Sequence, residues 1–599
     1  MAGFGSAGQV SDLTPTGLES GDVHASRASF AAPPMIGGGL RQVHWTLSSL
    51  CHASLVSGIF MQSIVKSNSG MNEDGHERRN PSGSKSQDGE TRPNVVLITL
   101  DAGRYDLLVE NLDSLPNLKA LAERSAFFEN AFSAGPVTTF AFPAIIGGVY
   151  PYHWGAGIDQ SVKAVDEVLK GSGYNTSFII EWNPLLSQRF GYGVRADFQL
   201  CKFALAEAGV TQPTTSDPGK KSREAGAWRF MERPYPLVGV VRKLRPLWER
   251  NQAARAVGSY VLSIGLFLRL YARRTGPNID KSRQDHHLFR ENLRGFINDR
   301  FESPQFLWVH TTVNHLPYAT PSSGSAFSAG RANYLNARGV SKFVNYGVCQ
   351  QLKRLYVESL KVADDLVGEI LGALSARGLL EDSIIIVTSD HGEEFMEEGT
   401  FFHDVESSSD ILLHVPLMIS GGGVVKARHI QVPVSSIDIP PTICDLVGVR
   451  TPESFRGISL KPILCETGHP DAGQGLQGRP LFSEGWVLKS TLDRIPGHKS
   501  HKRVFTVRKG SYKLKVTEVE RGKDTVEEKL ELTDWVSGRS VDLKSHREVV
   551  EELRHLVRQH TYEEGVVARN LKRKSERQHV KDALAKAKRT SVDVDRKGV

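Results

Sequence analysis

Residues 384–394 read IIIVTSDHGEE, and this stretch decides the fold class. The apolar run from Ile384 to Val387 predicts a buried strand, and Asp390 and His391 follow where that strand should end. In α/β sheets the loops after the strands carry ligand-binding groups, because the strands hold those loops in place. The stretch therefore predicts an α/β fold with a functional site here. The plainer alternative is an Asp that caps the next helix, with His packed nearby.

A second apolar run, VVLITL at 95–100, ends in the same way at Asp101. Two strand ends that carry Asp101 and Asp390-His391 indicate one metal site. Carboxylate oxygens suit a hard divalent cation and admit His as a partner, so we expect Ca²⁺, Mg²⁺ or Mn²⁺. Zn²⁺ would prefer more nitrogen or sulfur.

A third segment, GPVTTFAFPAIIGG at 135–148, supplies small residues and hydroxyls. We expect a helix to begin after Pro143 and to place a Thr side chain near its N-terminus, where backbone donors favour an anion. A Thr hydroxyl is a poor nucleophile until a base or a metal lowers its pKa. A cation held by Asp101, Asp390 and His391 would have that role.

The order of these motifs resembles the sulfatase family within the alkaline phosphatase superfamily, from about Arg92 to about Leu556. Further segments resemble family landmarks in the family's order. They are Gly173 to Thr176, His310 to Tyr318, His414 to Gly422, Ser435 to Ile443, and Gly457 to Leu460. The resemblance implies an alkaline-phosphatase-like fold. This fold has a central mixed, mostly parallel sheet flanked by helices and a smaller C-terminal α+β part.

One departure from the family pattern bears on the chemistry. Sulfatases commonly carry Cys or Ser, matured to formylglycine, in a Cys/Ser-x-Pro-x-Arg motif. Counting back from Gly148 places Thr138 at the nucleophile position, with Phe140 in place of the Pro and Phe142 in place of the Arg. A Thr cannot become formylglycine, so the resemblance implies direct attack by Thr138, with Thr139 as the alternative nucleophile.

The resemblance also implies substrate-side histidines and a small ligand set. His315 and His403 fall at positions where relatives contact substrate or protonate the leaving group, although either could be structural. His310 is expected to pack at a strand end. Ala102 stands where many sulfatases have a second metal-binding Asp. The implied ligands of one divalent cation are Asp101, Thr138, Asp390 and His391.

The 599 residues, 40% of them apolar, can bury a full α/β core and still carry appendages. Residues 1–91 read as a weakly ordered extension, 92–460 as the catalytic domain and 461–556 as a C-terminal subdomain. A basic stretch at about 197–285 reads as an insertion beside the active-site face: a lid, a surface for an anionic partner, or a solvated segment with no role in binding. Its apolar run at 256–268 is too short to span a bilayer.

The segment 569–599 holds eleven Lys or Arg and four Asp or Glu, a net charge of +7 that equals the formal charge of the whole chain. This basic tail is expected to lack packing. It could contact anionic lipid or nucleic acid, but most such tails are only solvated. Five cysteines without CxxC spacing indicate a reducing compartment with mostly buried thiols. We therefore expect a cytoplasmic protein, with membrane association as an alternative.

The leading hypothesis is a metal-dependent hydrolase of phosphate or sulfate esters that uses a Thr nucleophile. Its substrate would be an anionic ester, and the sequence leaves the oligomeric state open. Two alternatives are a phosphoglycerol-type head-group transferase and a binding protein that has lost turnover on the same scaffold.

Overall fold

The computed structural model describes residues 92–154, 157–201, 279–321, 323–424, 427–465, 475–486, 502–521 and 525–597. The predicted N-terminal extension lies outside these residues. So do most of the predicted insertion, with its apolar run at 256–268, and the last two residues of the basic tail.

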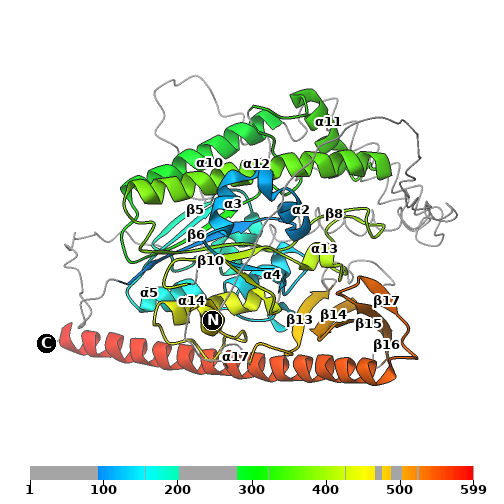
Figure 1. Ribbon diagram of the computed structural model, residues 1–599. Helices are drawn as coiled ribbons and strands as arrows, with labels where there is room; N and C mark the ends of the chain where they lie inside the picture. The colour runs from blue at the N-terminus through cyan, green and yellow to red at the C-terminus, as the bar shows by residue number, and fades with distance from the viewer. Residues whose placement is uncertain are drawn as a thin grey trace, which may run out of the picture.

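An eight-stranded sheet lies at the centre, in the order β11-β2-β10-β7-β1-β6-β4-β5 (Figure 1). β10 runs antiparallel to both of its neighbours, and every other pair in this sheet is parallel. The sheet is therefore mixed and mostly parallel, as predicted. Its strands are β1 (Asn94–Leu100), β2 (Ala126–Phe128), β4 (Asn175–Ile180), β5 (Phe198–Cys201), β6 (Gln305–Thr311), β7 (Ser383–Ser389), β10 (Leu417–Ser420) and β11 (Arg428–Ile430).

Strands β1 and β7 read as continuous apolar runs because both faces of the sheet are covered by helices. Successive side chains of a strand point to opposite faces. Val95 and Leu97 of β1 accordingly join one core cluster, whereas Val96 and Ile98 join the other. Both apolar runs are fully buried in the structure, as the sequence predicted.

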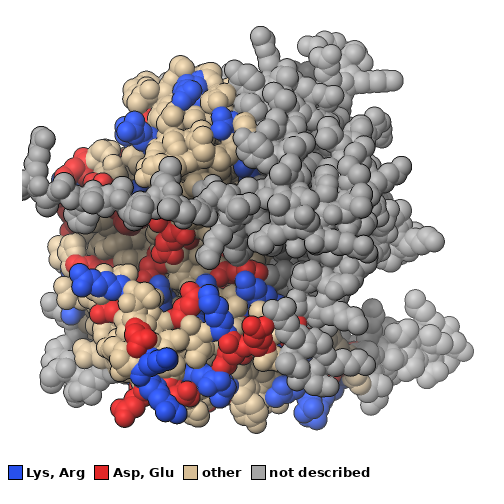
Figure 2. All heavy atoms as spheres, turned by 90° about the vertical axis from the view of Figure 1, so that its right-hand side faces the viewer, with Lys and Arg blue, Asp and Glu red and all other residues tan. Residues whose placement is uncertain are grey.

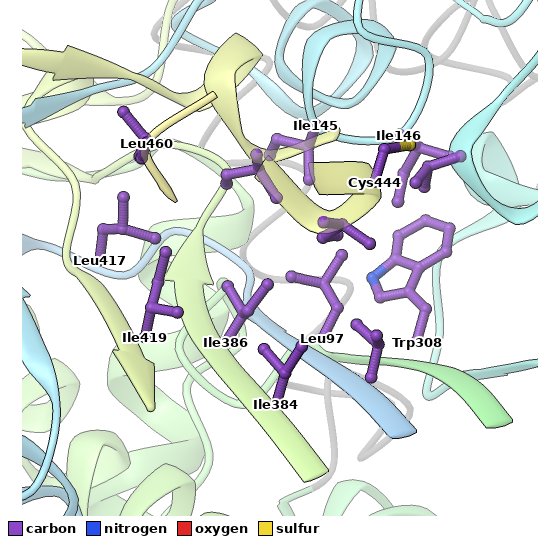
Figure 3. Close-up of a cluster of buried hydrophobic side chains, with 14 of the residues drawn as sticks. Leu97, Ile145, Ile146, Trp308, Ile384, Ile386, Leu417, Ile419, Cys444 and Leu460 are labelled. Carbon is purple, nitrogen blue, oxygen red and sulfur yellow. The ribbon is translucent and has the colours of Figure 1, made fainter. Parts of the chain in front are cut away.

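One layer of helices covers the face seen at the top of Figure 1 and another covers the opposite face. The upper layer consists of α2 (Tyr105–Glu110), α3 (Pro116–Ala122), α10 (Ile279–Asp299), α11 (Ala329–Val340) and α12 (Tyr346–Ala376). The lower layer consists of α4 (Thr138–Ile145), α5 (Val165–Gly171), α14 (Ile439–Leu446) and α15 (Lys461–Leu464). In Figure 3, Leu97, Trp308 and Ile386 of the sheet face Ile146 and Cys444 of the lower layer. The two layers hold the strands rigidly, which fixes the loops at the strand ends.

A second, five-stranded antiparallel sheet forms the C-terminal part, with its strands in sequence order. Its strands are β13 (Leu481–Trp486), β14 (Lys502–Lys509), β15 (Tyr512–Arg521), β16 (Thr525–Asp534) and β17 (Arg539–Val541). Apolar side chains of β14 and β15 pack on Val550, Leu553 and Val557 of helix α17 (Arg547–Lys597). The lower part of the face in Figure 2, where Figure 1 places this sheet, carries Lys and Arg among Asp and Glu.

Helix α17 includes most of the predicted basic tail, a segment for which no secondary structure was predicted. The helix runs without a break from Arg547 to Lys597, through the predicted boundary at 556 and through most of the tail. Beyond Ala568 its described side chains are mostly exposed. Lys, Arg, Glu and Ala have high helix propensity, and this segment contains no proline, so it stays helical with little packing. The basic residues therefore lie along a helix rather than in an irregular tail.

Of the described cysteines, Cys349 and Cys444 are buried free thiols and Cys465 is partly buried. None of the described helices is long and apolar enough to cross a membrane.

Candidate active site

The site lies at the carboxyl ends of β1 and β7, which are parallel neighbours. Leu100 pairs with Ser389 at the last step of their register, so Asp101 and Asp390 leave the sheet side by side. One ligand atom from each of Asp101, Asp390 and His391 can be chosen such that all lie within 4.8 Å of one another. The three side chains that the sequence predicted to share one ion are thus brought together, and all three are buried.

Each of the two carboxylates has one oxygen that receives no hydrogen bond. Asp390 Oδ1 accepts from the backbone N–H groups of Ala102, at 3.1 Å, and His391, at 2.9 Å. Asp101 Oδ2 accepts from Asn183 Nδ2 at 3.3 Å and lies 3.3 Å from His310 Nε2. Asp101 Oδ1 and Asp390 Oδ2 are buried and receive no hydrogen bond from the residues that the structure describes. A buried carboxylate oxygen without a donor is costly, and two of them beside an imidazole nitrogen fit a single divalent cation.

The two carboxyl groups differ in their electrostatics. Burial raises the pKa of Asp101, but the nearby His315, His310 and His391 outweigh burial and hold that pKa well below its usual range. Burial raises the pKa of Asp390, and the attraction of His391 offsets only part of that rise. Asp101 is therefore ionised, and a positive charge beside Asp390 would lower the raised pKa of that carboxyl group.

The ring of His391 is oriented so that its Nε2 atom faces the carboxylates. Nδ1 lies 2.8 Å from the carbonyl oxygen of Gly392, which can only accept, so Nδ1 carries the proton in the neutral ring. Nε2 then keeps its lone pair and lies 3.5 Å from Asp390 Oδ2 and 3.8 Å from Asp101 Oδ1. This is the arrangement expected of a metal-binding His whose other nitrogen is held by the backbone.

The backbone around the cluster is tightly constrained. Ala102 adopts a left-handed conformation, with φ of 59°, and thereby directs its N–H toward Asp390. A Cβ atom on Gly392 would lie 1.9 Å from the Ile411 carbonyl oxygen, so only glycine fits there. The buried Arg104 donates to the Glu393 carbonyl at 3.0 Å and pairs with Glu397, which joins the loops after β1 and β7.

Thr138 lies beside the cluster, with its Oγ1 atom 3.2 Å from His391 Nε2. It is the first residue of α4, and Pro143 lies inside that helix. The prediction that the helix begins after Pro143 is therefore wrong, because the proline occupies the second turn and the segment before it is already helical. Among the described residues, Thr139 makes no hydrogen bond to the cluster.

Phe140 and Phe142, which stand in place of the Pro and Arg of the family motif, are part of the apolar packing. Phe140 stacks on Trp486, with ring centroids 3.9 Å apart. Phe142 is buried and meets His310 edge to face, at a centroid distance of 5.1 Å. Where the family motif has a guanidinium group, this chain has an apolar ring packed on a histidine.

Two more predicted residues, His315 and His403, lie next to the cluster. The ring of His403 is 4.3 Å from that of His391 and 5.3 Å from that of His315. Its Nδ1 lies 3.0 Å from Glu393 Oε1, and burial holds the pKa of His403 well below its usual value. Burial also raises the pKa of Glu393 well above its usual value, so the two groups share at most one proton near neutral pH.

His310 has a larger part in the site than packing at the strand end. It is buried at the end of β6, as expected, but Nε2 faces Asp101 and Nδ1 lies 2.9 Å from Thr99 Oγ1. Thr99 in turn accepts from Trp308 Nε1 at 2.9 Å. Because the Asp101 carboxylate only accepts, His310 donates from Nε2, and the buried chain behind it fixes that tautomer.

Sequence reasoning missed Asn183, Glu393 and Lys342 near the site. Asn183 follows β4, whose parallel neighbour is β6, so the strand-end rule applied to Ile180 could have found it. Glu393 belongs to the quoted stretch but was assigned no role. Lys342 belongs to a connection between helices and gave no signal in the sequence.

Comparison with known proteins decides the family. Residues 93–449 match the sulfatase family. The chain belongs to the sulfatase family. This sulfatase is 26% identical over 419 residues to arylsulfatase K of Xenopus laevis, which covers 65% of this chain and 70% of that protein. It is 25% identical over 393 residues to the choline-sulfatase of Rhizobium meliloti (strain 1021), which covers 62% of this chain and 72% of the relative.

Among solved structures, the phosphonate monoester hydrolase from Silicibacter pomeroyi has a TM-score of 0.50 at 18% identity. The match covers 79% of this sulfatase and 95% of that chain, and it shows that the two proteins share a fold. The two curated relatives are hydrolases of sulfuric esters, and this sulfatase is an ester hydrolase of the same family.

Proposed function

We propose that this sulfatase is a metal-dependent hydrolase that cleaves sulfate or phosphate esters with Thr138 as its nucleophile. The observation that carries the proposal is the position of Thr138 Oγ1, 3.2 Å from His391 Nε2 at the edge of the three-residue cluster. An anionic ester would be drawn to the site only when the negative charge of the carboxylates is neutralised, which supports a bound cation.

Asp101 Oδ1, Asp390 Oδ2 and His391 Nε2 would hold the cation, with Thr138 as the fourth protein ligand. When bound, a divalent cation lowers the pKa of a coordinated hydroxyl and polarises an ester oxygen. The lone pair of His391 Nε2 can either accept the Thr138 proton or bind the cation, but not both at once. We assign it to the cation, because the unpartnered oxygens of Asp101 and Asp390 face the same point.

In the proposed first step, Thr138 Oγ1 gives its proton to solvent water and bonds to the central sulfur or phosphorus, while the bond to the ester oxygen breaks and that oxygen keeps the electron pair. The departing oxygen takes a proton and leaves as an alcohol. Water then cleaves the bond between Thr138 and the sulfo or phospho group, which restores the hydroxyl and releases the inorganic anion. His403 and His315 lie next to one another, with His403 beside His391. Burial keeps His403 neutral, which favours His315 as the group that protonates the leaving oxygen and leaves His403 to hydrogen-bond the ester.

The choice between sulfate and phosphate depends on the nucleophile. Family membership favours sulfate esters. Thr138 cannot be matured to formylglycine, so its covalent adduct must be released by water or by another acceptor. That requirement is compatible with phosphate esters, and it also leaves room for a transferase that uses an alcohol in place of water.

A panel assay tests the proposal. Aryl sulfates, aryl phosphate monoesters and aryl phosphodiesters are incubated with Ca²⁺, Mg²⁺ and Mn²⁺ in turn, with and without an added alcohol. We expect turnover of at least one class that depends on the cation and disappears in Thr138→Ala. Turnover that survives both EDTA and Thr138→Ala would contradict the proposal.

Phe142 and Ala102 favour a second candidate, a binding protein without turnover. An apolar ring stands in place of the motif's guanidinium, and Ala102 offers no ligand to a metal. This candidate predicts binding of an aryl ester or sulfate by the cation-loaded protein and no turnover in any arm of the panel.

A further inference from the structure

Lys342 occupies a backbone position that normally belongs to glycine. Helix α11 ends in a Schellman motif, in which Phe343 N–H donates to the Arg338 carbonyl at 3.0 Å and Lys342 N–H donates to the Gly339 carbonyl at 2.8 Å. This motif requires a left-handed residue, and Lys342 has a φ of 52°. That conformation costs about 1 kcal/mol or more for a residue with a Cβ atom. The fold therefore needs the turn but not the lysine.

The side chain of Lys342 extends toward the candidate active site. Its Nζ atom lies 5.3 Å from the ring centroid of Phe402. Phe402 in turn stacks on His403, at a centroid distance of 3.8 Å, and meets His315 edge to face at 5.4 Å. Lys342 thus stands at the outer end of a row of rings that starts at His391.

The charge of Lys342 is not neutralised by an ion pair. Within the part of the chain that the structure describes, no carboxylate lies within ion-pair distance of its Nζ atom, although Asp404 and Glu393 are near enough to affect it. Burial lowers the pKa of Lys342 to about 8 despite those two groups. The Lys342 ammonium group is half-buried, lacks an ion pair among the described residues and lies beside the substrate-side histidines. It can therefore bind an anion from solution.

We propose that Lys342 binds an anionic substituent on the alcohol part of the substrate, such as a carboxylate or a second sulfate group. This inference rests on the proposed function, because it takes the ester to bind at Thr138. The rings of His403 and Phe402 separate Lys342 from His391, so Nζ is placed to meet the leaving group rather than the ester being cleaved.

The test compares two esters that differ in one charge. The ratio of kcat/KM for 4-carboxyphenyl sulfate to that for 4-nitrophenyl sulfate is measured for the wild type and for Lys342→Gly, Lys342→Met and Lys342→Arg. A phosphate pair replaces the sulfates if the enzyme prefers phosphate. Because a hydrogen bond to a charged group contributes about 1.5 kcal/mol or more, the ratio should fall about tenfold in the Gly and Met variants and be retained in the Arg variant.

Lys342→Gly separates the role of the side chain from the role of the turn. Glycine is the preferred residue at this position, so the variant should unfold at the same temperature as the wild type or higher while the ratio falls. The matched charge control is Lys119→Met, which removes an exposed lysine paired with Asp113. An unchanged ratio in the folded Gly and Met variants would overturn the inference.

A binding arm makes the result independent of turnover. Calorimetry with 4-hydroxybenzoate, the alcohol released from the charged ester, should show about tenfold weaker binding to cation-loaded Lys342→Gly than to the wild type. Equal binding by the two proteins would count against Lys342 even if no ester were cleaved. Absence of turnover together with a Lys342-dependent difference in binding would instead contradict the proposed function alone.

Discussion

Acidic side chains are treated differently in two regions of the molecule. In and beside the C-terminal sheet several of them meet Lys or Arg: Glu528 pairs with Arg554, and Asp410 pairs with Arg508 and Lys513. The buried Glu484 of that sheet also has a partner within the chain, His560 at 2.8 Å. At the carboxyl edge of the eight-stranded sheet, no Lys or Arg of the described residues forms an ion pair with Asp101 or Asp390. Among the described residues, the ion-pair partners of those two carboxylates are histidines.

We interpret the carboxylates that pair with Lys or Arg as groups that stabilise the fold, and Asp101 and Asp390 as groups that bind a ligand. A paired carboxylate has its desolvation cost offset within the chain, whereas under the proposed function a cation from solution would offset that cost for Asp101 and Asp390. If this is right, changes at the sheet edge should alter activity and cation affinity, and changes in the C-terminal part should alter stability alone.

The largest effect is expected from Thr138→Ala. Loss of a nucleophile that bonds to the substrate should lower kcat at least about a thousandfold, while the Asp and His ligands keep cation affinity within a few-fold of the wild type. Thr139→Ala is the matched control and should lose much less, and Thr138→Ser should keep part of the activity. Steady-state kinetics and calorimetry with the cation measure both quantities. Full activity in Thr138→Ala would point to attack by water.

Asp390→Asn should separate stability from cation affinity. Loss of an anionic ligand should weaken cation binding by about a hundredfold or more, a larger effect than loss of the neutral Thr138 hydroxyl, since even residues behind the ligands account for tenfold to a hundredfold. Because burial disfavours the charged form of Asp390, the neutral variant should unfold at a higher temperature than the wild type in EDTA at pH 8. Thermal unfolding with and without cation measures both effects, with Asp113→Asn at the surface as control. If the cation raised the unfolding temperature of Asp390→Asn as much as that of the wild type, Asp390 would not be a ligand.

Arg508→Met tests the C-terminal side of the comparison. The Arg508 side chain is 2% exposed and pairs with Asp410, so its removal leaves a carboxylate with Lys513 as its remaining partner. The free energy of unfolding should fall by about 2 kcal/mol, less than for a buried charge left alone. Denaturant unfolding measures this value, and the double variant with Asp410→Leu should recover part of it. A large change in cation affinity would break the separation between the two regions.

Asp166 in α5 is a buried scaffold carboxylate without an ion pair among the described residues, so it challenges the comparison. Burial, aided by Glu167, raises its pKa from 3.8 to about 7. Between these values the folded state keeps a proton that the unfolded state has lost, so the stability that this proton supplies declines as the pH rises and is gone above about pH 7. The neutral Asp166→Asn variant should therefore gain about 2 to 3 kcal/mol relative to the wild type on going from pH 5 to pH 8. Denaturant unfolding measures the free energies of both proteins at pH 5 and pH 8. If the difference between variant and wild type were the same at the two pH values, Asp166 would be ionised in the folded protein at both.

Much of this arrangement could be predicted from the sequence. Apolar runs that end in Asp101 and Asp390 predict buried parallel strands, and parallel strands bring their carboxyl ends together. Asp101, Asp390, His391 and Thr138 do lie side by side in the structure. Their predicted roles remain proposals.

Other features depend on contacts that no local pattern reveals. The start of α4 at Thr138 is set by packing on both sides of Pro143, which overrides the usual tendency of proline to begin a helix. Lys342 lies near the candidate active site only because helix α11 ends beside Phe402, a residue distant from it in the sequence. The helical form of the basic tail follows from residue propensity, which charge counting ignores.

A crystal structure with Mn²⁺ tests the central claim most directly, because the anomalous signal locates the ion without reference to activity. We predict one strong peak within about 2.6 Å of Asp101 Oδ1, Asp390 Oδ2 and His391 Nε2, beside Thr138, and no peak there in Asp390→Asn. A Mn²⁺-saturated crystal with no peak between these three atoms, or with its peak elsewhere, would contradict the account.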